Sequence, residues 1–249
     1  MTLSKKTDAL TKGPDEQMSE QELQDLAAAG TGTVHGSDGK DTLFGTSGGD
    51  TIYGDSSDSY SSSQGSDDLI LGGSGNDSLE GQAGDDTLFG GSGNDFVGGG
   101  QGNDLVDGGE GNDTLYGDKG DDTVLGGGGD DVIGYIGQSG DDLLDGGEGN
   151  DTVRGGKGDD VIIGGEGDDL LSGGGGADVF VFGDDHGNDV IRDFNPGQDR
   201  LLFQTQDSAS LSVTTDESGN TLISFGDTTI TMPGVSLTFE QVLALSDFE

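Results

Sequence analysis

Aspartate recurs every nine residues along most of this chain, in a register regular enough to suggest metal chemistry. The series shifts by two residues before Asp142 and again before Asp189, and it is interrupted at Ser59. Each Asp holds the sixth place of a unit such as 72–80, which reads Gly-Gly-Ser-Gly-Asn-Asp-Ser-Leu-Glu. Carboxylates repeated in this way are candidate ligands for a hard cation. The candidate metal-binding residues are Asp41, Asp50, Asp68, Asp77, Asp86, Asp95, Asp104, Asp113, Asp122, Asp131, Asp142, Asp151, Asp160, Asp169, Asp178 and Asp189.

The donor atoms that these units offer are oxygens, and this favours calcium. Glycine-rich turns expose backbone carbonyls, and one Asp per turn supplies the charge. Calcium accepts about six to eight oxygen ligands in flexible geometry, whereas magnesium demands an octahedron and retains its water. The chain has no Cys, and His35 and His186 lie near the two ends of the array, which argues against zinc and copper. The alternative is that Gly and Asp merely form solvated turns. Sixteen aspartates in register argue against it, because such a stack would repel itself unless cations neutralised it.

The other residues of each unit predict the elements that position the carboxylates. Glycines at the first, second and fourth places permit a tight turn, and the last three residues form a short strand. The centre of that strand is apolar from Leu79 to Leu171 and is expected to point inward. A Gly-Gly-x-Gly-x-Asp-x-apolar-x period is typical of a parallel β-helix that binds calcium. Two units form one coil of 18 residues, so we predict two parallel sheets around a thin aliphatic core.

Successive units should alternate between the two edges of this roll. We therefore predict that Asp41, Asp77, Asp95, Asp113 and Asp131 line one edge, and that Asp50, Asp68, Asp86, Asp104 and Asp122 line the other. Neighbours on one edge would be about 4.8 Å apart, the spacing of paired strands. The Ser-rich segment 54–66 should form an irregular coil, and the extra pair at Tyr135 and Ile136 should lengthen a strand or form a bulge.

The composition excludes an ordinary globular domain. Gly accounts for 53 of 249 residues, only 28% are hydrophobic, and the net charge is −41. Self-repulsion on this scale opposes compaction, so the chain needs a counter-cation before it can fold. The same charge disfavours nucleic acid and anionic lipid as partners. No apolar run approaches the roughly 20 residues of a membrane-spanning helix, so we expect no transmembrane segment.

We predict an all-β fold with three parts. Residues 1–33 form an N-terminal segment with a short helix, from about Ser19 to Ala29, begun by a capping box. Residues 34–193 form the calcium-dependent parallel β-roll, and residues 194–249 form a β-rich cap. In the cap we expect strands at 200–203, 211–214, 221–225 and 228–232, a hairpin turn at 217–220 and a final helix begun by a second capping box at Thr238.

Units such as 90–95, 108–113 and 146–151 resemble the haemolysin-type, or RTX, calcium-binding repeat, and the resemblance covers residues from about 36 to 193. It implies a β-roll that folds with calcium and that leaves the cell through a type I secretion apparatus, using an uncleaved C-terminal signal. It further implies that turn carbonyls and the Asp residues of stacked turns share each ion. On this basis Asp77 and Asp95 would hold one ion and Asp86 and Asp104 another, with carbonyls such as those of Gly73 and Gly75. Ser59 would weaken the sites beside it, near Asp41 and Asp77.

We predict a secreted calcium-binding protein, extracellular or attached to the cell surface, that acts as a scaffold and is not an enzyme. About 33 residues precede the array, too few for a catalytic domain. The alternative is an adhesin or matrix module that binds polysaccharide or a cell surface, with segment 54–66 as the first place to look. An enzyme would need an active site within 200–245, where no His or Cys occurs, and an ice-binding solenoid would need regular Thr-x-Thr ladders, which the strands lack.

Overall fold

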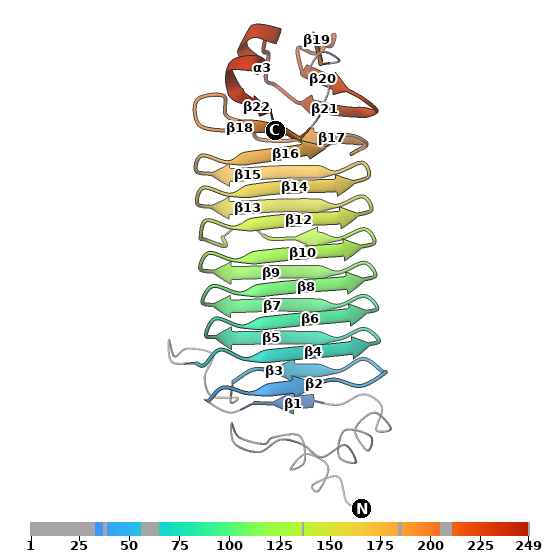
Figure 1. Cartoon of the computed structure of the whole chain (residues 1–249), viewed down its shortest axis with the longest axis vertical. Helices are drawn as coiled ribbons and strands as arrows, with labels where there is room; N and C mark the ends of the chain where they lie inside the picture. The colour runs from blue at the N-terminus through green and yellow to red at the C-terminus, as the bar shows by residue number, and fades with distance from the viewer. Residues whose placement is uncertain are drawn as a thin grey trace, which may run out of the picture. The chain divides into compact units, whose positions relative to one another are not determined.

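The computed structural model describes residues 33–36, 39–55, 65–135, 137–183, 186–204 and 211–248. The chain divides into two compact units, residues 1–124 and 125–249, and each contains a parallel β-roll (Figure 1). The predicted helix at Ser19–Ala29 and the break at Ser59 lie outside the described residues. The division at residues 33 and 193 stays a prediction.

The first unit has two parallel sheets, whose strand orders are β1-β3-β5-β7-β9 and β2-β4-β6-β8. Strands that pair within a sheet are mostly 18 residues apart in sequence, as Leu88 and Val106 are. The strands are β1 (Thr33–His35), β2 (Thr42–Phe44), β3 (Thr51–Tyr53), β4 (Leu69–Ser74), β5 (Ser78–Ala83), β6 (Thr87–Ser92), β7 (Phe96–Gln101), β8 (Leu105–Glu110) and β9 (Thr114–Lys119). Strand β10 (Thr123–Gly128) lies across the division between the units.

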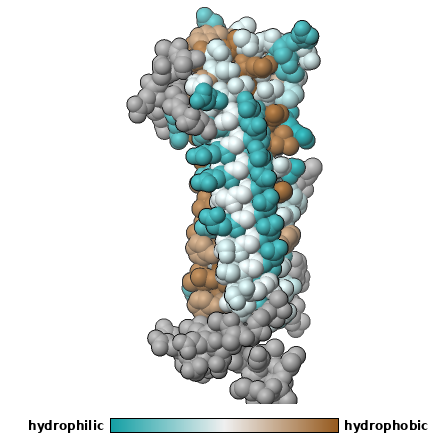
Figure 2. Space-filling model, turned by 90° about the vertical axis from the view of Figure 1, so that its right-hand side faces the viewer, coloured by the Kyte–Doolittle hydropathy of each residue, from teal (hydrophilic) through white to brown (hydrophobic). Residues whose placement is uncertain are grey.

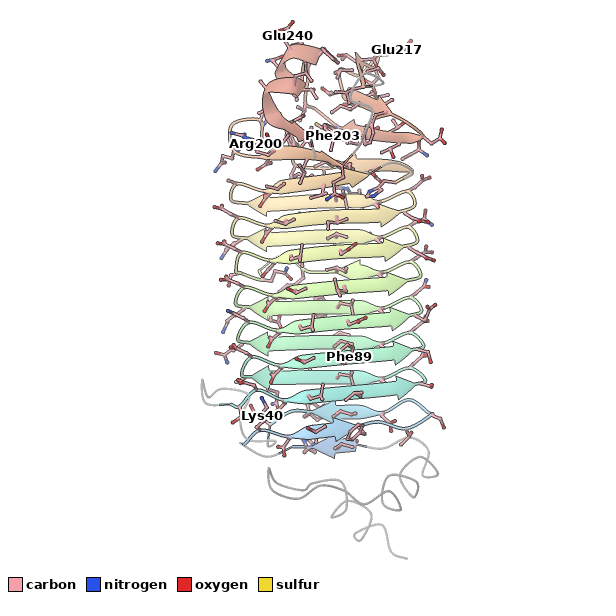
Figure 3. All side chains as sticks on the ribbon, in the orientation of Figure 1. Lys40, Phe89, Arg200, Phe203, Glu217 and Glu240 are labelled. Atoms are coloured by element: carbon pink, nitrogen blue, oxygen red, sulfur yellow. The ribbon has the colours of Figure 1, made fainter. Side chains whose placement is uncertain are left out.

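The nine-residue period explains why these strands form. In β6 the side chain of Leu88 is completely buried, while Thr87 and Phe89 on either side of it are partly exposed. The predicted inward-facing positions are confirmed, because every central apolar residue from Leu79 to Leu171 is fully buried. Figure 3 shows the side chains on the strands of each unit. Most of these strands have six residues rather than the predicted three, because glycines also pair across strands, as Gly73 does with Gly91.

The second unit repeats this arrangement with the sheet orders β11-β13-β15-β17-β21-β20-β19 and β12-β14-β16-β18-β22. All pairs in it are parallel except β19–β20 and β20–β21. The strands are β11 (Val132–Ile133), β12 (Leu143–Glu148), β13 (Thr152–Lys157), β14 (Val161–Glu166), β15 (Leu170–Gly175), β16 (Val179–Gly183), β17 (Asn188–Ile191), β18 (Arg200–Gln204), β19 (Ser212–Thr215), β20 (Thr221–Phe225), β21 (Thr228–Met232) and β22 (Ser246–Phe248). The all-β parallel roll predicted from the repeat is therefore confirmed.

One coil of the second unit departs from the repeat. Strand β11 ends at Ile133, and Gly134 follows with a positive φ of 73°. The chain regains the ladder at an isolated bridge between Ser139 and Lys157. Strand β11 therefore ends before Tyr135, so the first of the two predicted alternatives, a lengthened strand, is wrong. The left-handed backbone at Gly134 turns the chain out of the sheet.

The C-terminal part of the second unit, residues 211–248, is called the cap here. The four strands predicted between residues 200 and 232 are confirmed: β18 precedes the cap, and β19, β20 and β21 lie within it. The predicted hairpin turn is also confirmed, since Asp216 N–H donates to Asn220 O at 3.1 Å. Helix α3 (Phe239–Leu245) begins at Thr238 with the predicted capping box, which is also confirmed. Among the described residues, no helix combines the length and apolar character required to cross a membrane.

Candidate metal centre

Within each unit the repeated aspartates form rows linked by hydrogen bonds. The backbone N–H of each Asp donates to Oδ1 of the Asp one coil further on, at 2.6 to 2.9 Å in the first unit and 2.7 to 3.2 Å in the second. The first unit contains the rows Asp41-Asp68-Asp86-Asp104-Asp122 and Asp50-Asp77-Asp95-Asp113. The second contains the rows Asp131-Asp151-Asp169-Asp189 and Asp142-Asp160-Asp178-Asp199.

Two aspartates lie on the edge opposite to the predicted one. Asp41 is linked to Asp68, and Asp50 is linked to Asp77, each over 27 residues instead of 18. The chain takes nine additional residues between β3 and β4, so the alternation of edges skips a unit there. The remaining aspartates of the first unit lie in the same row as the neighbours predicted for them. Figure 2, which faces the turns, shows hydrophilic residues in columns beside pale surface.

The other carboxylate oxygen of each Asp, Oδ2, lies next to the glycine at the first place of its unit, as Asp95 Oδ2 does beside Gly90. The space between this glycine, Oδ2 and the carbonyl oxygen of the next coil is called the cradle here. A Cβ atom added to Gly90 would be 2.6 Å from Oδ2 of Asp95 and 2.6 Å from the carbonyl oxygen of Gly108. The space beside this glycine therefore faces one carboxylate oxygen and one carbonyl oxygen of the next coil. Gly72 repeats the arrangement, with Asp77 Oδ2 at 2.7 Å and Gly90 O at 2.5 Å. Glycine at the first place keeps this space open.

Glycines at the second and fourth places bring further carbonyl oxygens toward the next coil. Gly91 and Gly93 have φ values of 111° and 130°, where other residues would be strained. A Cβ on Gly91 would collide with the carbonyl oxygen of Gly73, and a Cβ on Gly93 with that of Gly75. These are the two carbonyls that the repeat resemblance assigns to an ion.

Many of the Oδ2 atoms are buried and accept no hydrogen bond from any described residue. Asp86 and Asp160, for example, are 1% and 0% exposed. An ionised oxygen buried without a partner is costly, so its presence in a native fold requires an explanation. The residues with such an Oδ2 are Asp68, Asp77, Asp86, Asp95, Asp104, Asp151, Asp160, Asp169 and Asp189.

Burial also changes the acidity of these groups. It raises the pKa of Asp104 and of Asp189 to about 8, and the charges of neighbouring aspartates add to the effect. Burial likewise raises the pKa of Asp86 to about 7 and that of Asp77 to about 6. Without a cation, the rows would therefore take up protons near neutral pH. A bound cation supplies the missing positive charge and frees the carboxylates to ionise.

The residues present fit calcium. In the described part of the chain no three His, Cys, Asp or Glu side chains gather as a metal cluster, so a cation here must draw on backbone carbonyls as well. Carboxylate and carbonyl oxygens together are the donor set of a hard cation. Asp77 and Asp95 are adjacent in one row, as are Asp86 and Asp104 in the other. Their sharing of ions stays a prediction.

Two buried aspartates were missed by the sequence analysis. Asp199 accepts from the backbone N–H of Asp178 at 3.2 Å and so continues the row of Asp142 beyond Asp178. The sequence feature that could have identified it is the Gly-x-Asp-x-apolar spacing from Gly197 to Leu201, which matches the repeat. Asp55 is completely buried, and its charge adds to the effect of burial in raising the pKa of Asp68. It follows a glycine at the first place of a unit, the only cue to its role.

At three aspartates, protein groups already donate to Oδ2. Asp50 accepts from the backbone N–H of Thr46 at 2.6 Å and from its hydroxyl at 2.8 Å. Asp199 accepts from the backbone N–H of Asn195 at 2.7 Å, and Asp142 accepts from Nε2 of Gln138 at 3.2 Å. At turns such as those of Asp86 and Asp160, no described group donates to the equivalent Oδ2.

The repeat pattern matches a known protein family. The family model of the RTX calcium-binding nonapeptide repeat matches residues 28–59, 63–97, 98–133, 136–162 and 154–191. No curated protein sequence matches the chain. A crystal structure of the extracellular lipase LipA from Serratia marcescens is 21% identical with a TM-score of 0.38, over 84% of this chain and 39% of the lipase. The AlgE6R3 subunit of the Azotobacter vinelandii mannuronan C5-epimerase is 29% identical with a TM-score of 0.29, over 58% of this chain and 81% of that subunit.

Proposed function

Because the chain belongs to the family of RTX calcium-binding repeat proteins, we propose that it is a secreted protein whose rolls fold on binding several calcium ions. Outside the cell it acts as a calcium-dependent scaffold and not as an enzyme. The observation that carries this proposal is the set of buried, unpartnered Oδ2 atoms in register within each unit. Binding free energy at such sites is folding free energy, because no site exists in the unfolded chain.

Calcium concentration would then decide where the protein folds. Extracellular calcium modules bind with dissociation constants of about 10⁻⁴ to 10⁻³ M, far above cytosolic free calcium. With a net charge of −41, the chain would stay extended inside the cell. An extended chain suits passage through a type I secretion channel, and external calcium would then drive folding.

Circular dichroism tests the calcium step. The purified chain in chelator is titrated with calcium and, separately, with magnesium. A cooperative gain of β structure with calcium that magnesium does not reproduce would support the proposal. A spectrum that is rich in β structure in chelator and indifferent to calcium would refute it.

Export needs a test of its own. The chain is expressed in bacteria with and without a co-expressed type I secretion apparatus, and the protein is measured in the medium and in the cells. We expect the protein in the medium only when the apparatus is present. Equal retention in the cells under both conditions would contradict this part of the proposal.

A second candidate function, adhesion to polysaccharide, has one specific observation in its favour. In the first unit, one sheet carries residues in register along its outer face: His35, Tyr53, Glu80, Gly98 and Tyr116. The rings of His35 and Tyr53 stack at 4.7 Å, and Phe96, 40% exposed, meets Tyr116 edge-on at 5.4 Å. Flat aromatic faces beside a carboxylate suit a neutral sugar, whereas the negative charge of the chain disfavours acidic glycans.

Affinity electrophoresis in calcium tests this second function. Neutral and acidic polysaccharides are cast into gels, and retardation of the wild-type chain is compared with that of a Tyr53→Ala, Phe96→Ala, Tyr116→Ala variant. We expect retardation by a neutral glycan, lost in that variant but kept in a Phe44→Ala, Phe89→Ala control on the other sheet. No retardation of the wild type by any neutral glycan would exclude this function for the glycans used.

A further inference from the structure

The loop after β11 places a glutamine side chain inside the second unit. Gln138 is completely buried, and its backbone is held to β13 because Lys157 N–H donates to Gln138 O at 3.2 Å. Its Oε1 accepts from the backbone N–H of Tyr135 at 3.3 Å. Its position in the unit is therefore set by contacts at both the backbone and the side chain.

The amide nitrogen of Gln138 joins two oxygens of different coils. Nε2 donates to Oδ2 of Asp142 at 3.2 Å and to the carbonyl oxygen of Arg154 at 3.3 Å. A primary amide has two N–H donors, so both contacts can form at once. The carboxylate oxygen that lacks a protein donor at most other turns is here satisfied by the protein itself.

An ordinary turn of the same unit faces the same kinds of oxygen without such a donor. Beside Gly155, the added Cβ would meet Oδ2 of Asp160 and, at 2.7 Å, the carbonyl oxygen of Gly173. Each pair thus consists of an Asp Oδ2 and a carbonyl oxygen from the next coil. At Asp160 nothing in the described structure donates to Oδ2, whereas at Asp142 the amide does.

We propose that the Gln138 amide takes the place of a calcium ion, so that the turn at Asp142 stays free of metal in a roll that otherwise binds it. The proposal rests on the calcium binding proposed above for the ordinary turns. The N–H dipoles satisfy the carboxylate and the Arg154 carbonyl without a full positive charge, so these two oxygens are already partnered and do not need an ion. Asp142 is then a structural residue, and the coil that contains it holds together at calcium concentrations that leave its neighbours empty.

Calcium stoichiometry of full-length variants, measured by equilibrium dialysis, separates Asp142 from Asp160. We expect Asp160→Asn to bind fewer ions than the wild type, and Asp142→Asn to bind the same number. An equal loss in both variants would overturn the proposal. If the wild-type chain binds no calcium at all, the proposed function fails, and this inference fails with it.

The converse variant, Gln138→Glu, should create a site. A second carboxylate facing Asp142 Oδ2 and the Arg154 carbonyl completes an oxygen set, so we expect an additional ion per chain. In chelator the like charges should lower the stability of this variant below that of the wild type. Gln101→Glu, which adds the same charge at the partly exposed end of β7, is the matched control and should leave the stoichiometry unchanged. Unchanged stoichiometry in a Gln138→Glu variant that folds with calcium would contradict the proposal.

Discussion

The coils and the cap differ in the kinds of side chain that they bury. A coil strand such as β8 contributes one central aliphatic side chain, Val106, to the core, and the neighbouring turn buries a carboxylate. In the cap, the described residues 211–247 bury Phe225, Ile223, Ile230 and Met232 but no carboxylate. Its buried Thr221 hydroxyl has a partner, the carbonyl oxygen of Val235 at 2.8 Å.

The difference shows where each region obtains its stability. One buried Val or Leu contributes about 1.5 to 3 kcal/mol, and burying an unpaired carboxylate can cancel that gain. The coils therefore need a cation or a proton, while the cap has hydrophobic packing and satisfied polar groups. Four changes test this contrast, beginning with the one expected to have the largest effect.

Acidification of the chain in chelator should have the largest effect. The pKa of Asp104 in the fold is raised from 3.8 to about 8 by burial, so between these values the folded state binds more protons than the unfolded state. The stability of the calcium-free roll should therefore fall as the pH rises through this window and return on acidification. Circular dichroism in chelator should show more β structure at about pH 5 than at about pH 8. In calcium the dependence should reverse, because protons compete with the ion; the same profile with and without calcium would contradict the account.

Phe203→Ala should give the largest effect of a single substitution in the second unit. Phe203 of β18 is completely buried and packs edge-on against Phe225 of the cap at 5.0 Å (Figure 3). Removing such a ring costs about 3 to 5 kcal/mol. Phe89→Ala, on the partly exposed outer side of β6, is the control and should cost much less. Urea unfolding in saturating calcium measures the loss of unfolding free energy in both variants. Equal losses would contradict the difference in burial between the two rings.

Gly90→Ala tests the cradle. Its methyl group would lie 2.6 Å from Asp95 Oδ2 and from Gly108 O, so the turn must shift and the ion site is obstructed. We expect a loss of about 1 to 3 kcal/mol from overpacking and a higher calcium midpoint in the titration. Gly175→Ala is the matched control, because an added Cβ there meets nothing within 4 Å. Identical calcium midpoints for the two variants would remove the support for the cradle.

Thr238→Ala should have the smallest effect and should not depend on calcium binding. The Thr238 hydroxyl accepts from Gln241 N–H at 3.3 Å, and Gln241 Oε1 accepts from Thr238 N–H at 2.9 Å. Losing an N-cap of this kind costs about 1 kcal/mol. Thr238→Ser, which keeps the hydroxyl, is the control. The cost should appear in urea unfolding with no change in the calcium midpoint; a shifted midpoint would mean that cap and ion sites are coupled.

Much of the fold follows from the nine-residue period because it is a local rule repeated many times. An apolar residue two places after each Asp predicts the inward side chains, and Leu88 and Leu144 lie where the rule puts them. The cap strands were predictable from β-branched and aromatic alternation, and the helix start from its capping box at Thr238.

The sequence could not reveal how interruptions are absorbed. Counting by nines put Asp41 beside Asp77, but the ladder pairs Asp41 with Asp68 and leaves the extra residues between strands. Enlarging a loop costs little entropy, so the chain keeps its paired strands and skips a unit. The roles of Asp55 and Asp199 also depend on contacts between coils that no local pattern specifies.

The coil, the direction of its side chains and the oxygen donors of its turns could be predicted from the sequence, because they depend on residues close together along the chain. The pairing of aspartates into rows, and the presence of a protein donor at some of them, depend on how the coils stack. Gln138 is an example: its amide donates to Asp142 and also to the carbonyl of Arg154, which is 16 residues further along the chain, because stacking brings successive coils together.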